Sequence, residues 1–87
     1  MTDGMDRSDG AFVDRVARIV ETVYSLAPGS VTAASTSEDI ERWDSLGHLV
    51  LMLELEQEFG VQLQPDETSE MTSVRAIVDT LRDRPPA

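Results

Sequence analysis

Ser45 and His48 are the two residues of this chain that are best suited to act together as a nucleophile and a base. They lie three positions apart in a segment with helical spacing, so their side chains are neighbours on one helix face. A serine hydrolase also needs a group that orients the histidine and donors that stabilise an oxyanion. The sequence has no Gly-x-Ser-x-Gly motif, and 87 residues supply too few elements to enclose an intermediate. We therefore expect a protein that is not an enzyme, with His48 on the helix surface, within reach of a group attached nearby or of a partner.

Ser45 stands where a long loop meets the strongest predicted helix, and its hydroxyl has two possible roles there. As an N-cap residue it would accept an N–H of the first helical turn, which is the ordinary role of serine at this position. A helix N-terminus also favours phosphate, because its N–H groups are free and the positive end of the helix dipole lies there. A phosphodiester on Ser45 would thus lie in a compatible field, beside the apolar side chain of Leu46.

The composition argues against thiol, metal and nucleic-acid chemistry. The chain has no Cys and a single His, and the acidic residues 66–70 lack the alternating ligands and central Gly of a calcium loop. Seventeen acidic residues oppose seven basic ones, which disfavours nucleic acid and anionic membranes and favours a basic protein partner. The first ten residues lack the apolar core of a signal peptide, and no segment has the ~20 apolar residues of a membrane span. We therefore expect a cytoplasmic protein.

The hydrophobic spacing predicts an all-α fold, a four-helix bundle with three main helices, one short helix and a long first loop. The apolar residues of the first helix recur at steps of three and four over residues 12–24. We expect a flexible N-terminal tail over residues 1–10, a folded domain over residues 11–83 and a C-terminal tail over residues 84–87. A chain of this length has material for one core, and we expect a monomer.

The bounds of the other elements follow from their end signals. Residues 27–43 form a loop that is long for a compact domain, and such loops are usually functional or disordered. The strongest helix is predicted over residues 45–59, because a glycine follows in the position of a left-handed cap. Pro65 introduces the short helix, and the last helix begins after Thr72 or Ser73 as its cap.

The helix over residues 45–59 carries apolar residues on two opposite flanks, whereas a helix in a small bundle usually needs one. The first flank, called the Leu46 stripe below, consists of Leu46, Leu49, Val50 and Leu53. The second flank consists of Leu51, Met52, Leu55 and Phe59. Either the helix is central and buried nearly all round, or one flank is exposed as an interaction surface. We expect exposure of the stripe, with Leu49, Val50 and Leu53 as partner contacts. The acidic residues expected to frame it are Glu54, Glu56 and Glu58.

Two motifs of this chain resemble those of the acyl carrier proteins, which are carriers of the phosphopantetheine-binding superfamily. The first is Trp43-Asp44-Ser45-Leu46-Gly47-His48-Leu49 and the second is Leu53-Glu54-Leu55-Glu56-Gln57-Glu58-Phe59-Gly60-Val61. Asp-Ser-Leu alone is a weak signal, but Glu-x-Glu-Phe-Gly follows it at the spacing of the family. Thr72-Ser73-Val74 then opens a final helix, as it does in the family, and the resemblance covers about residues 12–81.

The resemblance implies a carrier that is charged at Ser45. A separate phosphopantetheinyl transferase would esterify this serine with the 4′-phosphopantetheine of coenzyme A. The terminal thiol of that arm would hold an acyl or aminoacyl group as a thioester. Asp44 would position the serine for the transferase, and Leu46 would contact it. The acidic helix would be the recognition face for a loading ligase or transferase and for downstream biosynthetic enzymes.

Two positions depart from the pattern of many fatty-acid carriers. Those carriers have acidic residues two and five positions after the serine, where this chain has Gly47 and Val50. The first motif is instead more similar to discrete carriers of specialised pathways, which serve polyketide-type or aminoacyl units, while a fatty-acid-type pathway stays open. Two alternatives stay open for the core: its side chains simply pack together, or they shelter the carried group. The candidate lining residues for shelter are Leu46, Met52, Leu63, Met71 and Ile77.

A second class of function fits the same residues. An unmodified acidic adaptor would use the stripe to bind a basic or apolar partner surface without a prosthetic group. Such an adaptor would keep its partner affinity in a Ser45→Ala variant, whereas a carrier would lose its function while remaining folded.

Overall fold

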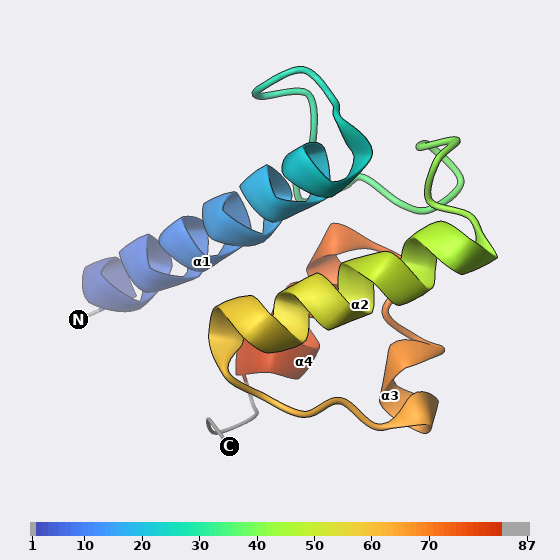
Figure 1. Cartoon of the computed structure of the whole chain (residues 1–87). Coiled ribbons are helices and arrows are strands. Elements are labelled where there is room, and N and C mark those ends of the chain that lie inside the picture. The colour runs from blue at the N-terminus through green and yellow to red at the C-terminus, as the bar shows by residue number, and fades with distance from the viewer. Residues whose placement is uncertain (1, 83–87) are drawn as a thin grey trace.

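The computed structural model describes residues 2–82, with side chains from residue 10 onward. Its four helices are α1 (Thr2–Tyr24), α2 (Ser45–Phe59), α3 (Pro65–Thr68) and α4 (Val74–Arg82). Figure 1 shows α1 above α2, with α4 behind α2 and the short α3 near the N-terminal half of α2. Because α1 packs against both α2 and α4, it holds the bundle together. The predicted all-α fold, with three main helices, one short helix and a long first loop, is confirmed.

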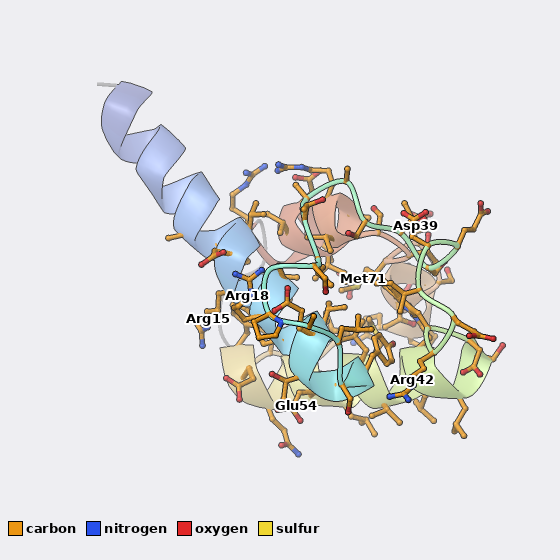
Figure 2. All side chains as sticks on the ribbon, turned by 90° about the horizontal axis from the view of Figure 1, so that it is seen from above. Arg15, Arg18, Asp39, Arg42, Glu54 and Met71 are labelled. Carbon is orange, nitrogen blue, oxygen red and sulfur yellow. The ribbon has the colours of Figure 1, made fainter. Side chains whose placement is uncertain are left out.

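The first helix begins earlier than the sequence predicts. Residues 2–10 belong to α1, so a helix that begins only near residue 12 is wrong, while the flexibility expected of residues 1–10 stays a prediction. Adding a residue to an existing helix gains a hydrogen bond without a new nucleation cost, so the packed part of α1 can extend through polar sequence. Figure 2 shows these first turns projecting away from the other helices. The expected C-terminal tail, residues 84–87, lies outside the described residues, and the expected domain limits stay predictions.

The core lies between the inner faces of the three main helices and the first loop, residues 25–44. Its fully buried side chains include Val16, Val20, Leu51, Leu55, Met71, Val74, Ile77 and Val78. The loop contributes Val31, Ile40 and Trp43, which are 3%, 8% and 4% exposed. Figure 2 shows Met71 in the interior of the bundle. The long loop is therefore fixed to the core by three apolar side chains.

Local signals set the ends of the later helices where the sequence places them. Gly60 adopts φ 63° after α2, and its N–H bonds to the carbonyl of Glu56, so it is the expected left-handed cap. Pro65 is the first residue of α3. The hydroxyl of Ser73 accepts the N–H of Ala76 at 3.0 Å, so Ser73 is the cap residue that begins α4.

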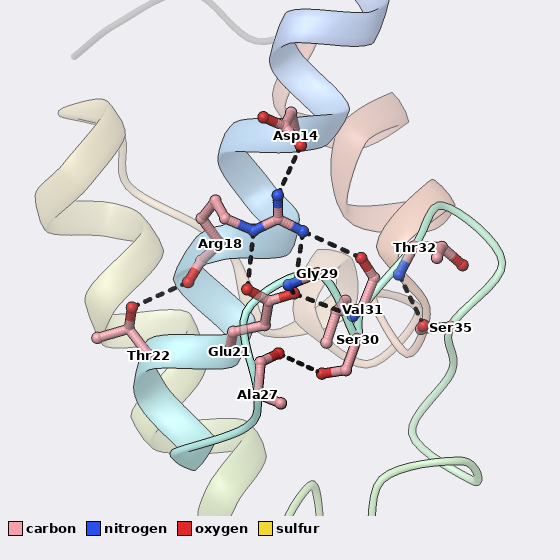
Figure 3. A network of polar contacts seen from close by, with 10 residues as sticks. All are labelled: Asp14, Arg18, Glu21, Thr22, Ala27, Gly29, Ser30, Val31, Thr32 and Ser35. Atoms are coloured by element: carbon pink, nitrogen blue, oxygen red, sulfur yellow. Dashed lines mark hydrogen bonds and ion pairs between the residues drawn. The ribbon is translucent and has the colours of Figure 1, made fainter.

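A buried carboxylate fixes the start of the first loop (Figure 3). Glu21 is 4% exposed, and its Oε2 accepts the N–H groups of Gly29 at 2.9 Å and Val31 at 3.0 Å. Its Oε1 pairs with Nε of Arg18 at 2.8 Å. Burial alone would raise the pKa of Glu21, but the hydrogen bond from Val31, the ion pair with Arg18 and the bond from Gly29 outweigh it. The net pKa of Glu21 is therefore lowered, and the loop folds around an ionised side chain.

Replacing Glu21 by Gln is expected to lower the free energy of unfolding at pH 7 by about 2–4 kcal/mol, because buried donors lose their acceptor. A lowered pKa in the folded state means that the carboxylate stabilises the fold above its ordinary pKa of 4.5. That contribution is lost as the pH falls through the lowered pKa. Urea unfolding at several pH values should therefore show the gap between wild type and variant closing below about pH 4.

The matched control for this prediction is Glu41→Gln, which alters an exposed carboxylate of the same loop. We expect it to change the free energy of unfolding by no more than about 0.5 kcal/mol. Equal effects of the two substitutions at pH 7 would contradict a structural role for Glu21.

Candidate functional site

Asp44, and not Ser45, caps the N-terminus of α2. Its Oδ1 accepts the N–H of Gly47 at 2.8 Å, and its backbone is extended, with φ −93° and ψ −167°. Ser45 is the first helical residue and is exposed. Within residues 2–82, no hydrogen bond engages its hydroxyl. The N-cap role of Ser45 is therefore wrong, and its hydroxyl stands free at a helix N-terminus.

Ser45 borders a cleft of about 440 Å³ between the first loop, α2 and the turn that joins α3 to α4. The lining residues are Ser37, Trp43, Asp44, Ser45, His48, Ser69 and Thr72. Four of these side chains carry hydroxyl groups, and they come from three separate segments of the chain. The cleft therefore begins at the free hydroxyl of Ser45. Its walls are mostly polar, and the indole ring of Trp43 adds an apolar surface.

His48 is held by hydrogen bonds at both ring nitrogens. Nε1–H of Trp43 donates to its Nδ1 at 2.9 Å, and its Nε2 lies 2.7 Å from the carbonyl oxygen of Thr68. An indole nitrogen can only donate, so Nδ1 accepts and Nε2 carries the proton that bonds to Thr68. His48 is half-buried and borders the cleft beside Ser45, so the expected contact with an attached group or a partner stays a prediction, with both ring nitrogens already engaged. This histidine joins the first loop, α2 and α3, and both nitrogens are unavailable to Ser45.

Gly47 allows the first loop and α1 to approach α2 closely. A Cβ atom at this position would collide with the carbonyl oxygen of Arg42 and lie 3.1 Å from Cε1 of Tyr24. The hydroxyl of Tyr24 donates to the carbonyl oxygen of Gly47 at 2.8 Å. Burial, and then the charge of Asp44, raises the pKa of Tyr24, so the phenol remains a donor. The missing acidic side chain two positions after Ser45 thus has a structural reason.

The guanidinium of Arg42 also fixes the end of α1. Its Nη1 donates to the carbonyl oxygen of Tyr24 at 2.8 Å, at the negative end of the helix dipole. Ser25 follows in a left-handed conformation, with φ 57°. The segment that leads into Ser45 is therefore tied to α1 on one side and to α3, through His48, on the other.

The Leu46 stripe is exposed, as the sequence predicts. Its members Leu46, Leu49, Val50 and Leu53 are 71%, 55%, 48% and 52% exposed. On the opposite flank of α2, Leu51, Met52 and Leu55 are buried. The alternative of a helix buried all round is therefore wrong. Leu46 is also wrong as a candidate lining residue of the core, because its side chain points outward.

The three acidic residues of α2 are not equivalent. Glu56 uses Oε2 to accept the N–H of Leu63 at 2.9 Å, which ties α2 to the segment before α3. Glu54 and Glu58 lie on the side of α2 that faces α1, where they border a hollow of about 350 Å³ together with Arg15 and Arg18. Glu56 therefore has an internal partner, whereas Glu54 and Glu58 stand beside basic side chains of α1.

None of the described helices is both long and apolar enough to cross a membrane, and residues 2–82 contain no group of three acidic or histidine side chains suited to a metal ion.

Comparison with known proteins adds to this geometry. A family model described as the phosphopantetheine attachment site matches residues 14–81. The chain is 28% identical over 83 residues to "Acyl carrier protein 2, mitochondrial" of Arabidopsis thaliana. The aligned region covers 95% of this chain and 64% of that protein. It is 32% identical over 73 residues to "Acyl carrier protein" of Thermosynechococcus vestitus. That aligned region covers 83% of this chain and 89% of that protein. The chain therefore belongs to the acyl carrier proteins, non-catalytic carriers of the phosphopantetheine-binding superfamily that bear a covalently attached 4′-phosphopantetheine.

Proposed function

We propose that Ser45 is the residue that carries 4′-phosphopantetheine, and that the chain presents acyl or aminoacyl groups to biosynthetic enzymes. The observation that carries this proposal is the free, exposed hydroxyl of Ser45 at the start of α2. Because Asp44 provides the cap, modification of Ser45 costs the helix no hydrogen bond. When bound, the group supplies the thiol that holds the acyl group.

The first turn of α2 suits a phosphate on Ser45. The first N–H groups of a helix have no intrahelical acceptor. The N–H of Gly47 is taken by the Asp44 side chain and that of His48 by the Asp44 carbonyl, which leaves those of Ser45 and Leu46. These N–H groups and the helix dipole favour an anion at this place. Asp44 thereby acts as a positioning residue, because its cap fixes the turn that presents Ser45.

The cleft beside Ser45 suits the rest of the arm. A pantetheine chain contains amide groups, which donate and accept hydrogen bonds. Ser37, Ser69 and Thr72 place hydroxyl groups along the cleft, and Trp43 adds an apolar surface. The hydroxyl of Ser69 already donates to the carbonyl of Asp66, so it would serve the arm as an acceptor.

Intact-mass spectrometry tests this proposal. The full chain is incubated with coenzyme A and a broad-specificity phosphopantetheinyl transferase, beside the Ser45→Ala variant. Wild type should gain the mass of one phosphopantetheine group, and the variant should gain none. An unchanged wild-type mass, or an equal gain in both proteins, would contradict the assignment of Ser45.

For the pathway, we favour specialised biosynthesis of the polyketide or aminoacyl type over fatty-acid synthesis. Gly47 offers no charge close to Ser45, and Val50 adds an exposed apolar side chain where many fatty-acid carriers have an acid. A partner would therefore meet an apolar surface near the attachment point. We expect a monomer in the cytoplasm, since partners need the Leu46 stripe uncovered, although the relative from Arabidopsis is described as mitochondrial.

Leu49→Glu and Leu53→Glu are each expected to weaken binding of a partner enzyme at least about tenfold while the domain stays folded. Both side chains are about half exposed, so the change in the free energy of unfolding should stay near 0.5 kcal/mol. The proteins are compared by calorimetric titration with a purified loading enzyme and by urea unfolding.

The control is Gln62→Glu, which adds the same charge at an exposed position outside α2. It should leave affinity nearly unchanged. If Leu49→Glu and Leu53→Glu unfold the domain, or if the folded variants bind as tightly as wild type, the stripe is not the docking surface.

A further inference from the structure

The cleft of the candidate site has one wall whose position depends on the short helix α3. That wall is the segment between α3 and α4, and its side chains in the cleft are those of Ser69 and Thr72. At the α4 end the wall is fixed twice, because Met71 is fully buried and the N–H of Ser37 donates to the carbonyl oxygen of Thr72 at 2.8 Å. At the α3 end, none of the residues Pro65–Thr68 is buried. The place of this end therefore depends on polar contacts.

His48 supplies the contact that ties this end to α2. Its Nε2–H donates to the carbonyl oxygen of Thr68, the last residue of α3, at 2.7 Å. On the other side of the ring, Nδ1 accepts Nε1–H of Trp43 at 2.9 Å, and the two ring planes are nearly parallel, at 16°. Trp43 is 4% exposed and belongs to the core, so it holds the imidazole in place. The imidazole therefore joins the two walls of the cleft that come from the first loop and from α3.

Three hydroxyl groups of the cleft can bind the amide groups of an attached arm. Those of Ser37 and Thr72 have no hydrogen-bond partner within residues 2–82, so each can donate and accept. That of Ser69 donates to a backbone carbonyl of α3 at 2.9 Å and keeps its lone pairs for the arm. Because Ser69 follows Thr68 directly in the chain, the hydrogen bond from His48 also sets where this acceptor stands.

We propose that His48 is a positioning residue for the prosthetic group. By holding α3 against α2 through Thr68, it keeps the cleft in the shape that binds a 4′-phosphopantetheine arm on Ser45. The inference rests on the function proposed above, because it needs an arm at Ser45. Segments with few buried contacts open most readily, so α3 should open more often once the bond to Thr68 is lost. The hold of the chain on the arm should then weaken.

Two substitutions of His48 separate its two hydrogen bonds. The amide of Gln is as many bonds from Cα as Nε2 of histidine, so His48→Gln can still donate to the carbonyl oxygen of Thr68. The amide of Asn corresponds to Nδ1, so His48→Asn can still accept Nε1–H of Trp43 but leaves Thr68 without its donor. Both variants are uncharged, and each loses one of the two bonds. A role in stability alone predicts similar behaviour of the pair, whereas positioning through Thr68 predicts that they differ.

Amide hydrogen exchange of the full unmodified chain tests the hold on α3. The reporters are the amides of Thr68 and Ser69, which donate to the carbonyls of Gln64 and Pro65 at 3.0 and 3.1 Å. Their protection should fall about two- to tenfold in His48→Asn, the effect of one lost hydrogen bond, and should stay near the wild-type value in His48→Gln. Equal losses in the two variants, or losses spread equally over α1 and α4, would overturn the role of His48.

The arm itself is followed by NMR after the chain has been modified with coenzyme A and the phosphopantetheinyl transferase. The ring current of Trp43 should displace the geminal methyl signals of the arm from their positions in free coenzyme A, and nuclear Overhauser contacts should join the arm to Ser37 and Thr72. His48→Gln should keep this displacement, whereas in His48→Asn the ratio of held to free arm should fall about two- to tenfold. Equal displacement in all three proteins would overturn the proposal.

The modified wild type gives a test that does not depend on the folding of either variant. Arm signals identical to those of free coenzyme A would overturn the proposal and leave the assignment of Ser45 intact. A wild type that gains no group would overturn the carrier assignment and this inference together, while the exchange measurement would still show whether His48 holds α3. The two failures are therefore distinguishable.

Discussion

A Ser45→Ala variant is expected to lose carrier function completely and to keep its fold. The side chain is exposed, and the cap of α2 comes from Asp44, so the free energy of unfolding should change by no more than about 0.5 kcal/mol. Function should vanish because alanine offers no oxygen to which the prosthetic group can be attached. The measurement pairs transfer of a labelled acyl group to the chain, after treatment with transferase and coenzyme A, with thermal unfolding of both proteins.

The control for this loss is Ser69→Ala, which removes another exposed hydroxyl from the same cleft. That variant should still be modified and should still accept the acyl group. Retention of labelled acyl by Ser45→Ala would contradict the account. So would the opposite pattern, in which Ser69→Ala loses the label and Ser45→Ala keeps it. The unmodified adaptor, which the exposed stripe alone also fits, predicts no effect of either substitution on partner binding.

Gly47→Ala should be the most destabilising of the conservative substitutions at the site. The added methyl group collides with the carbonyl oxygen of Arg42 and crowds the ring of Tyr24. Relief of that collision moves the first loop or α1 and weakens the hydrogen bond from Tyr24 to the carbonyl of Gly47. Overpacking and the lost bond together should lower the free energy of unfolding by about 2–4 kcal/mol. In a domain whose total stability is about 5 kcal/mol, urea unfolding would detect this clearly.

The same substitution at Gly10 provides the control. A Cβ atom there meets nothing within 4 Å, and Gly10 lies inside α1. Gly10→Ala should therefore stabilise the domain by about 0.5–1 kcal/mol, because alanine favours the helix. If Gly47→Ala were also stabilising, the close approach of Arg42 to α2 would be incorrect.

The parts of the fold that depend on local signals could be predicted from the sequence. The left-handed cap at Gly60, the start of α3 at Pro65 and the bounds of α2 each follow from residue type and spacing. The extension of α1 to Thr2 has no apolar pattern, so periodicity could not reveal it. The burial of Glu21 could not be predicted either, since it depends on backbone groups of the loop that fold over it from 8 and 10 residues away.

The candidate functional site also has some features that the sequence predicts and others that it does not. Exposure of the Leu46 stripe followed from two apolar flanks on one helix. The N-cap role that the sequence allowed for Ser45 belongs to Asp44, because the two residues are adjacent and both types favour that position. The role of His48 was missed because Thr68, the acceptor of its Nε2–H, is 20 residues away in sequence. Side-chain hydrogen bonds across such separations depend on the tertiary fold, which helical periodicity does not specify.

Fragmentation mass spectrometry of the modified chain is the most direct test of the central claim. After treatment of wild type with coenzyme A and the transferase, the peptide that carries the added group is sequenced residue by residue. The free hydroxyl at the start of α2 predicts that the group is found on Ser45 alone. Its presence on Ser37, Ser69 or Thr72 of the same cleft, or on no residue at all, would contradict the account.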